Sequence, residues 1–390
     1  MLELNKKKLM ENIVIETSPN NKEIELEKND SVVIDVPFNP NDIKVSTQPL
    51  TLGDLIDRLE HDEIKLDTEF QRGMDLWSLT KKSRLIESVL LRLPIPTFYF
   101  DAKDDDKWRV IDGLQRISTL KSFVVDQSHA LVDLEFLKEY EGKKYDELPR
   151  DLQRRIKTFP ITAYILEKGT PDIVKYNIFS RINQGGLVLT PQEMRHALHQ
   201  GKAAELVREM VDSESEVGAV FKQATDWRIT NWRMEDRDFA TRFAAFYLTP
   251  FQNYEPDLDS FLNKGMSNIN KCSDVQIQKL KQDFIKAMNT AFEIFGNDAF
   301  RKRFNEDDYR KPINKALFEV LSVSFAKLSN EQCSRLIRRK IKFRRKFQAL
   351  HNEENGLFLR SITQGTAQKG TVETRFKSIE RIIRETLSDD

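Results

Sequence analysis

The sequence contains little cysteine, proline or glycine. Cys272 and Cys333 are its only two cysteines, and they lie too far apart to form a C-x-x-C pair. This usage fits a reducing compartment and excludes a disulfide framework. With 14 glycines and 13 prolines the chain stays well below the usual combined share of about 12%, which excludes collagen-like and low-complexity proteins. The 25 phenylalanines exclude a mostly disordered chain, so we expect a helix-rich globular protein.

Long apolar segments are missing as well. No run approaches the roughly 18 apolar residues that a transmembrane helix needs. The basic stretch at the start, MLELNKKKLMENIVIE, is not followed by the apolar core of a signal peptide. We therefore expect a cytoplasmic protein that has no membrane partner.

The chain has no net charge, because 62 basic side chains balance 62 acidic ones. This excludes a protein that binds nucleic acid through a uniform positive charge. The charge is nevertheless unevenly spread. Residues 301–346 hold 15 Lys or Arg and 5 Asp or Glu, a net of +10, so the remainder of the chain is acidic.

The densest part of this basic segment is SRLIRRKIKFRRKF, residues 334–347, which has the spacing of one amphipathic helix. Its apolar face would consist of Leu336, Ile337, Ile341, Phe343 and Phe347. One interpretation is a solvated helix face whose charges are balanced by acidic neighbours, and the other is a surface that binds the phosphate backbone of DNA or docks a partner. In the second interpretation, the DNA contacts would come from Arg338, Arg339, Lys340, Arg344 and Arg345.

The length of 390 residues allows two or three domains. Residues 1–46 alternate short extended runs with Asn and Asp clusters, which predicts a hairpin or small sheet as a leader. Residues 47–200 mix strand and helix patterns. Residues 201–390 show almost only helical patterns, with breaks near Thr249-Pro250, Asn297, Pro312 and residues 356–370. The expected fold class is α+β, followed by a mostly α-helical C-terminal region.

Local signals place several elements within residues 47–200. Thr51 and Asp54 have the spacing of a capping box at the start of a helix, and Thr190 and Glu193 repeat it with Pro191 at the first helical position. Further helices are predicted at residues 81–93 and after Thr170. Strands are predicted at residues 97–102, 108–111 and 160–166.

The sequence Asp112-Gly113-Leu114-Gln115-Arg116 lies between a predicted strand and a predicted helix. Gly113 would allow a tight turn and a close approach to a ligand. The start of the helix favours an anion, and Arg116 in its first turn makes better sense beside a phosphate. Asp112 could bind a metal or orient a water. The alternative is a structural turn in which Asp112 caps the helix.

Two further loops carry similar chemistry. One holds Glu69, Gln71 and Arg72, followed by Trp77, and the other contains Asn183, Gly185 and Gly186 ahead of a helix with Glu193 and Arg195. Loops that a scaffold positions are common places for binding groups. His196 and His199 could form a metal pair on one helix, but we interpret them as structural. His351, in QALHNEEN, is expected in a surface loop.

The motifs PFNPNDIKVS, LDTEFQR with a following Trp, VIDGLQRISTL and FSRINQGGLVLTPQEMRHAL occur in that order. Together they resemble the N-terminal domain of the GmrSD-type restriction endonucleases, over roughly residues 37–200. The resemblance implies a ParB/sulfiredoxin-like nucleotide-binding domain with a D-G-Q-Q-R motif, spanning residues 47–200. It also implies nucleoside triphosphate hydrolysis and a role in defence against phage and other foreign DNA.

The resemblance assigns roles to individual residues. The D-G-Q-Q-R motif falls on residues 112–116, with Asp112, Gln115 and Arg116 as catalytic residues and Asp112 as the expected Mg²⁺ ligand. The family's other motifs imply that Gln71, Arg72, Trp77, Gly113, Asn183, Gly185, Gly186, Glu193 and Arg195 bind the nucleotide. Leu114 departs from the pattern, because the family usually has Gln there, which puts the rate or the specificity of hydrolysis in question.

Three functions stay open. The first is a nucleotide-hydrolysing, DNA-sensing component of a defence system, with any nuclease or toxin on a separate subunit, since the histidines of an HNH nuclease are lacking. The second is a regulatory, antitoxin-like module that binds nucleotide or DNA without hydrolysis. The third is a nuclease in which Asp112, Glu69 and Glu193 converge on a metal.

Overall fold

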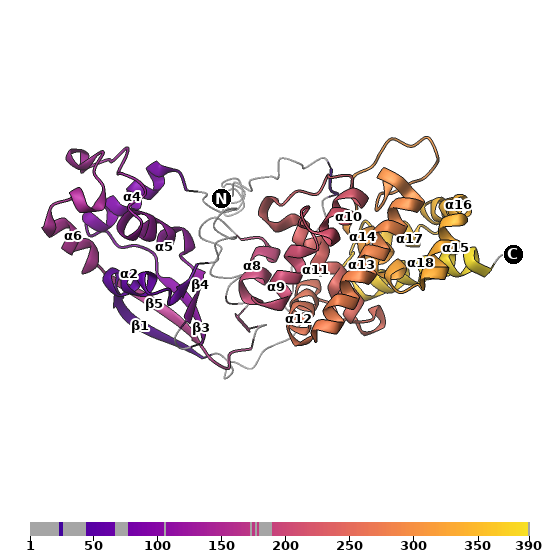
Figure 1. The fold of residues 1–390 in the computed structure, drawn as a ribbon, viewed down its shortest axis with the longest axis horizontal. Helices are drawn as coiled ribbons and strands as arrows, with labels where there is room; N and C mark the ends of the chain where they lie inside the picture. Colours follow the sequence, from indigo (N-terminus) through magenta and orange to yellow (C-terminus); the bar gives the residue numbers. More distant parts are fainter. Residues whose placement is uncertain are drawn as a thin grey trace, which may run out of the picture. The chain divides into compact units, whose positions relative to one another are not determined.

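The computed structural model describes residues 23–25, 44–66, 77–104, 107–171, 174–175, 178 and 189–388. They form two compact units (Figure 1). The α/β unit lies within residues 34–200. The helical unit consists of the chain from residue 201 onward together with the short segment 23–25. The rest of the predicted leader up to residue 43 lies outside the described residues.

A mixed sheet forms the centre of the α/β unit. Its five strands lie in the order β1-β5-β3-β4-β2. The pairs β1–β5 and β3–β4 are antiparallel, whereas β3–β5 and β2–β4 are parallel. The strands are β1 (Val45–Thr51), β2 (Ile64–Lys65), β3 (Phe98–Asp104), β4 (Lys107–Asp112) and β5 (Pro160–Glu167).

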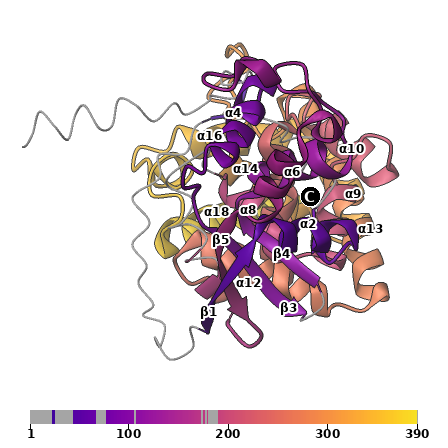
Figure 2. The same ribbon diagram turned by 90° about the vertical axis from the view of Figure 1, so that its left-hand side faces the viewer.

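Side chains alternate between the two faces of this sheet, as the pleat requires. One face buries Phe98, Phe100 and Ala163 beneath four helices, which lie on the same side in Figures 1 and 2. These helices are α2 (Leu52–Glu60), α4 (Leu79–Leu90), α5 (Leu114–Leu120) and α6 (Arg150–Lys157). A π-helical turn, Lys121–Val125, continues α5.

A smaller apolar cluster covers the other face of the sheet. Met194 and Leu198 of α8 (Pro191–Leu198) pack there with Ile111 of β4 and Leu166 of β5. The predicted strands are confirmed, and so are the two capping boxes, at Thr51–Asp54 and at Thr190–Glu193. The capping boxes could be predicted because they need only residues three positions apart.

The C-terminal part of the chain is helical, as predicted. Its helices are α9 (Lys202–Glu209), α10 (Glu216–Ala224), α11 (Glu235–Leu248), α12 (Leu258–Lys271), α13 (Asp274–Phe295), α14 (Lys315–Ala326), α15 (Asn330–Arg338), α16 (Lys340–His351), α17 (Leu357–Ser361) and α18 (Lys369–Ser388). No helix in the described part of the chain is long and apolar enough to span a bilayer.

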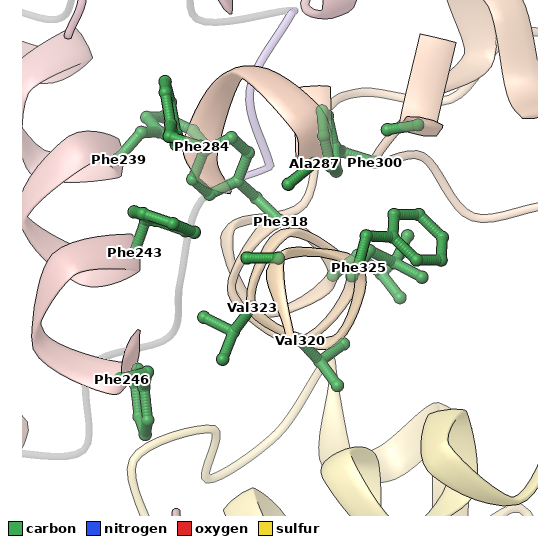
Figure 3. Packing of buried hydrophobic residues seen from close by; sticks show 14 of the residues in the cluster. Phe239, Phe243, Phe246, Phe284, Ala287, Phe300, Phe318, Val320, Val323 and Phe325 are labelled. Atoms are coloured by element: carbon green, nitrogen blue, oxygen red, sulfur yellow. The ribbon is translucent and has the colours of Figure 1, made fainter. Parts of the chain in front are cut away.

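Helix α14 lies at the centre of this unit, and every residue from Ala316 to Ala326 is buried. It packs against α11, α13 and α18. Figure 3 shows Phe239 and Phe243 of α11 facing Phe318 of α14, with Phe284 of α13 beside them. Aromatic side chains bury a large apolar area each, so this cluster accounts for much of the driving force for folding.

A polar network is buried within the same core. Glu319 of α14 accepts hydrogen bonds from Arg242 of α11 and from Arg375 of α18, the second at 2.6 Å. Arg242 also donates to Asp238 at 2.9 Å. Buried charges are tolerated when they are paired in this way, and the network fixes how three helices meet.

Candidate functional site

The turn between β4 and α5 is built around a glycine, as predicted. Gly113 has φ +102°, in the left-handed region that favours glycine. A Cβ atom at this position would lie 2.6 Å from Cδ1 of Phe98, closer than real contacts allow. Backbone conformation and lack of space therefore both require a glycine here.

An ion pair closes this turn. Nη2 of Arg116 donates to Oδ2 of Asp112 at 2.7 Å, and Nη1 donates to the carbonyl oxygens of Thr97, at 3.2 Å, and Pro96. The guanidinium group also lies 4.6 Å above the ring of Phe98. Only 7% of Arg116 is exposed. The side chain is thus held by the protein itself.

This geometry corrects two steps of the sequence interpretation. The alternative interpretation had Asp112 as the helix cap, but Gly113 occupies the N-cap position and no side chain caps it. The sequence also suggested that Arg116 makes better sense beside a phosphate, because a cation is unfavourable in the first helical turn. The carboxylate of Asp112 already supplies that negative charge.

The electrostatics of the pair leave one carboxylate oxygen available. Burial lowers the pKa of Arg116, and the adjacent Asp112 opposes that shift, so the guanidinium stays charged. Asp112 is half-buried. Its Oδ1 atom has no hydrogen-bond partner among the described residues. That atom could orient a water molecule or ligate a cation.

Leu114 and Gln115 begin α5 directly after the glycine, and both are half-buried. Trp77, further back along the chain, is also half-buried, and the ammonium group of Lys81 lies 5.0 Å from its ring centroid. The remaining predicted residues of the early and late loops, Glu69, Gln71, Arg72, Asn183, Gly185 and Gly186, lie outside the described residues.

Helix α8 places Glu193 and Arg195 in the interior of the α/β unit. The carboxylate of Glu193 accepts the backbone N–H of Thr190 at 2.6 Å, and Nε of Arg195 donates to Gln192 at 2.9 Å. Met194, between them, packs in one cluster with Ile111, the residue before Asp112. The fold therefore brings α8 next to the strand that ends at the glycine turn. His196 and His199 are buried as well.

A buried ion pair that was not predicted from the sequence lies on the same face of the sheet. Asp101 of β3 accepts a hydrogen bond from Lys175, and both side chains are buried. A charged residue inside the otherwise apolar strand TFYFDA was the signal that could have identified it, because such a residue needs a partner.

The described residues contain no preformed metal cage. No group of three or more His, Cys, Asp or Glu side chains there could hold an ion. Glu193, one of the three carboxylates that a nuclease site would need, already closes the capping box of α8. A single carboxylate at Asp112 does fit Mg²⁺, which usually takes one or two protein carboxylates together with substrate phosphates and waters.

The basic segment does not form the single helix that was predicted. It forms α15 and α16, which meet at Arg339, and Ile341 of the predicted apolar face is 63% exposed. Phe343 and Phe347 of the predicted face are buried in α16, and Leu350 joins them on the buried side of that helix.

Several of the basic residues bind the ends of neighbouring helices. Arg339 donates to the carbonyl oxygen of Thr386 at 2.8 Å, near the end of α18. Lys340 and Arg344 reach the carbonyl oxygens of Glu293 and Ile294 at the end of α13. Cations at helix C-termini are stabilising, so these three residues have structural roles.

Arg338 and Arg345 differ from them. Both are exposed, and neither has a hydrogen bond or an ion pair among the described residues. Of the five basic residues assigned to DNA, these two are therefore available for a ligand.

His351 is not in a surface loop, contrary to the prediction. It is the last residue of α16, is 3% exposed and is surrounded by the rings of Phe304, Phe347 and Phe358. Its Nδ1–H donates to the carbonyl oxygen of Phe347 at 2.8 Å. Burial lowers the pKa of His351 to about 4.

Comparisons with known proteins give a family match for the α/β unit. Residues 52–200 match the family model described as GmrSD restriction endonuclease, N-terminal domain. No curated protein and no solved structure matches the chain. The matched region contains β2 to β5, the glycine turn with Asp112 and Arg116, and α8. The resemblance found in the motifs is confirmed: residues 52–200 are similar to the GmrSD N-terminal domain.

Proposed function

We propose that this protein is the nucleotide-hydrolysing, DNA-sensing component of a prokaryotic restriction-type or anti-phage defence system. The match of residues 52–200 to the N-terminal domain of a restriction endonuclease supports the defence role. The proposal includes a ParB/sulfiredoxin-like fold for the α/β unit and a separate nuclease or toxin subunit as partner. DNA and a nucleoside triphosphate are its other ligands.

The observation that carries the hydrolytic role is the geometry of Asp112. Arg116 holds Oδ2 at 2.7 Å, and Oδ1 is left for a water molecule or a cation. A carboxylate fixed by one such contact can accept a proton from an attacking water or help to hold Mg²⁺, which would offset the charge of the phosphates when bound. Gln115, the residue before Arg116, can donate a hydrogen bond to the substrate or to water.

Arg116 has a different role in this proposal from the one that the sequence suggested. Its donors face Asp112, Thr97 and Pro96, so it acts as a positioning residue for Asp112. In this proposal Arg72 and the loop with Asn183, Gly185 and Gly186 bind the phosphates, as the family resemblance implies. Arginine suits phosphate because its planar group binds two oxygens at once.

DNA binding belongs to α15 and α16 in this proposal. Arg338 and Arg345 are exposed and have no protein partner among the described residues, which suits contacts to the phosphate backbone. Arg339, Lys340 and Arg344 support this surface indirectly, because they fix α16 against the ends of α13 and α18.

The test is a turnover assay on the purified full chain, with each of the four nucleoside triphosphates, Mg²⁺, and double-stranded DNA present or omitted. We expect hydrolysis of at least one nucleotide, with a rate that depends on DNA. Nucleotide binding without turnover in every condition would contradict the hydrolytic role.

A second function is a regulatory module that binds nucleotide or DNA without hydrolysis. Leu114 favours this second function. The family usually has Gln at this position, which lies in the first helical turn after the glycine, and Leu lacks the polar amide group. Leu114→Gln, which restores the family motif, separates the two functions. Turnover that appears only in Leu114→Gln supports the regulatory module, and equal turnover in both proteins supports the enzyme.

A further inference from the structure

Residues 23–25 pair with the helical unit through an isolated β-bridge between Ile24 and Ile313. The backbone N–H of Glu25 donates to the carbonyl oxygen of Ile313 at 2.8 Å, and the N–H of Ile313 donates to the carbonyl oxygen of Glu23 at 2.8 Å. The pairing is parallel, and Ile313 pairs on its other side with Arg301 in antiparallel direction. Ile313 thus lies between Ile24, which is distant in sequence, and Arg301, and it forms a β-bridge with each.

The side chain of Ile24 is buried in the core of the helical unit. It is 6% exposed and belongs to the same apolar cluster as Ile313 and Phe300. Removing an isoleucine side chain from water is favourable, so Ile24 can anchor a segment that is otherwise polar.

The two acidic side chains on either side of Ile24 meet basic partners. Glu23 accepts a hydrogen bond from Arg228 at 3.2 Å. Its other oxygen lies 4.0 Å from Nη2 of Arg301. Burial lowers the pKa of Arg301 to about 10, and Glu23 opposes that shift. The helical unit therefore presents positive charge where this end of the segment binds.

The other end of the segment is recognised in the same way. Glu25 accepts hydrogen bonds from Lys302 at 2.5 Å and from Asn314 at 3.1 Å. Asn314 also donates to the carbonyl oxygen of Ile362 at 2.7 Å, so its amide is fixed in place. Main-chain pairing, one apolar anchor and two charge contacts are the components of strand-addition peptide recognition.

We propose that the edge at Ile313 is a strand-addition site for an extended acidic–aliphatic–acidic peptide, and that residues 23–25 are its built-in, exchangeable occupant. We call these three residues the latch. In sequence, the α/β unit lies between the latch and the junction at residues 200–201. While the latch is bound, the chain therefore links the two units at both ends of the α/β unit. Release of the latch leaves only one link and frees the site for a peptide of the same chemistry.

A labelled peptide that copies residues 19–29 tests this on the full-length protein. Wild type is compared with Ile24→Asp, in which the latch loses its anchor. A built-in segment competes at an effective concentration of about millimolar, so we expect binding to Ile24→Asp to be at least about tenfold tighter than to wild type. A peptide that carries Ile24→Asp itself is the matched control and should not bind.

Two results would overturn the proposal. One is no binding of the peptide to Ile24→Asp when its circular dichroism is native. The other is equal binding to both proteins, which places the peptide elsewhere on the surface. A charge swap makes the site assignment specific: Arg228→Glu in the Ile24→Asp background should weaken the peptide, and a peptide with Glu23→Arg should restore binding.

A second measurement does not depend on how well Ile24→Asp folds. The double variant Glu23→Lys, Glu25→Lys changes only exposed or half-buried side chains. It should raise the rate of hydrogen exchange at the backbone amide of Ile313, which donates to the backbone carbonyl oxygen of Glu23. The amides of α14 should stay protected. Unchanged protection of Ile313 in this variant contradicts a releasable latch.

Discussion

Nη2 of Arg116 lies 2.7 Å from Oδ2 of Asp112, four residues earlier in the chain, and this ion pair closes the turn between β4 and α5. Gly113 between them allows the turn, and Arg116 spans it toward Pro96 and Thr97. The pair therefore fixes the position of the carboxylate before any ligand arrives. Such preorganisation is what a catalytic carboxylate requires.

Asp112→Asn should separate the chemistry of this residue from its structural role. The Asn side chain keeps an oxygen that can accept from Arg116. Asp112→Ala instead removes the acceptor as well and leaves a buried N–H group of Arg116 without a partner, so we expect it to lose about 1–3 kcal/mol of unfolding free energy. Urea unfolding of both variants measures the difference. Equal destabilisation by both substitutions would argue against the hydrogen bond to Arg116 as the reason.

Gly113→Ala should destabilise the α/β unit. The new methyl group meets Phe98, and the left-handed backbone is strained, so we expect a loss of about 2–4 kcal/mol. Gly142→Ala is a matched control, because Gly142 has φ +80° but a methyl group placed there would have no neighbouring atom within 4 Å. It should lose only about 1 kcal/mol from backbone strain. Denaturant unfolding that shows equal losses would rule out the contact with Phe98.

Glu319→Ala should be among the most damaging changes in the helical unit. It leaves Arg375 with unpaired charge in the core and removes one of the two carboxylates that pair with Arg242, which costs about 3–5 kcal/mol. Glu373→Ala removes the exposed ion pair with Lys377 and should cost less than about 1 kcal/mol. Thermal unfolding of both variants gives the comparison, and similar losses would contradict a network that fixes three helices.

His351 should make the helical unit less stable in mild acid. Its pKa falls from 6.5 to about 4 on folding, because burial disfavours the charged ring. Between these pH values the unfolded chain binds a proton that the folded protein does not, so stability falls as the pH falls from about 6.5 to about 4. The loss is on the order of 3 kcal/mol.

His351→Phe is the test of that pH dependence. The new ring fits among Phe304, Phe347 and Phe358 and cannot be protonated. The variant should lose less stability than wild type between pH 6.5 and pH 4.5 in urea unfolding. A variant with the same pH profile as wild type would show that other groups cause the acid sensitivity.

Arg338→Glu combined with Arg345→Glu should weaken DNA binding without unfolding the protein. We expect the slope of log affinity against log salt to shrink by about 0.9 for each phosphate that the protein no longer neutralises. Arg339→Glu is the contrasting variant, because it repels the end of α18 and should cost about 1–2 kcal/mol of stability. Unchanged affinity of the double variant would mean that this surface serves a protein partner or none.

Short-range patterns made much of the α/β unit predictable from sequence. Capping at Thr51 and Thr190, and the strand–glycine–helix order at Gly113, depend on residues within four positions of each other. The break at Arg339 was not predictable in this way. Arg339 at the break contacts the end of α18, 47 residues later in the chain, and such a contact leaves no local pattern in the sequence.

The partners of the site residues could not be predicted from the sequence either. The pattern showed that Arg116 was unusual in the first turn of a helix, but it did not show that Asp112 compensates for it. The same holds for Asp101 and Lys175, which become neighbours only when the sheet forms. Tertiary contacts decide such pairings, and spacing along the chain does not encode them.

The central claim is that Asp112, held by Arg116, carries nucleotide hydrolysis. Its most direct test is the Mg²⁺-dependent turnover of Asp112→Asn against wild type and Glu373→Ala, each with DNA present and with the same unfolding midpoint confirmed. We expect wild type and Glu373→Ala to hydrolyse nucleotide at equal rates and Asp112→Asn to lose at least about 100-fold, the usual contribution of a general base. Wild-type turnover in Asp112→Asn would contradict the account.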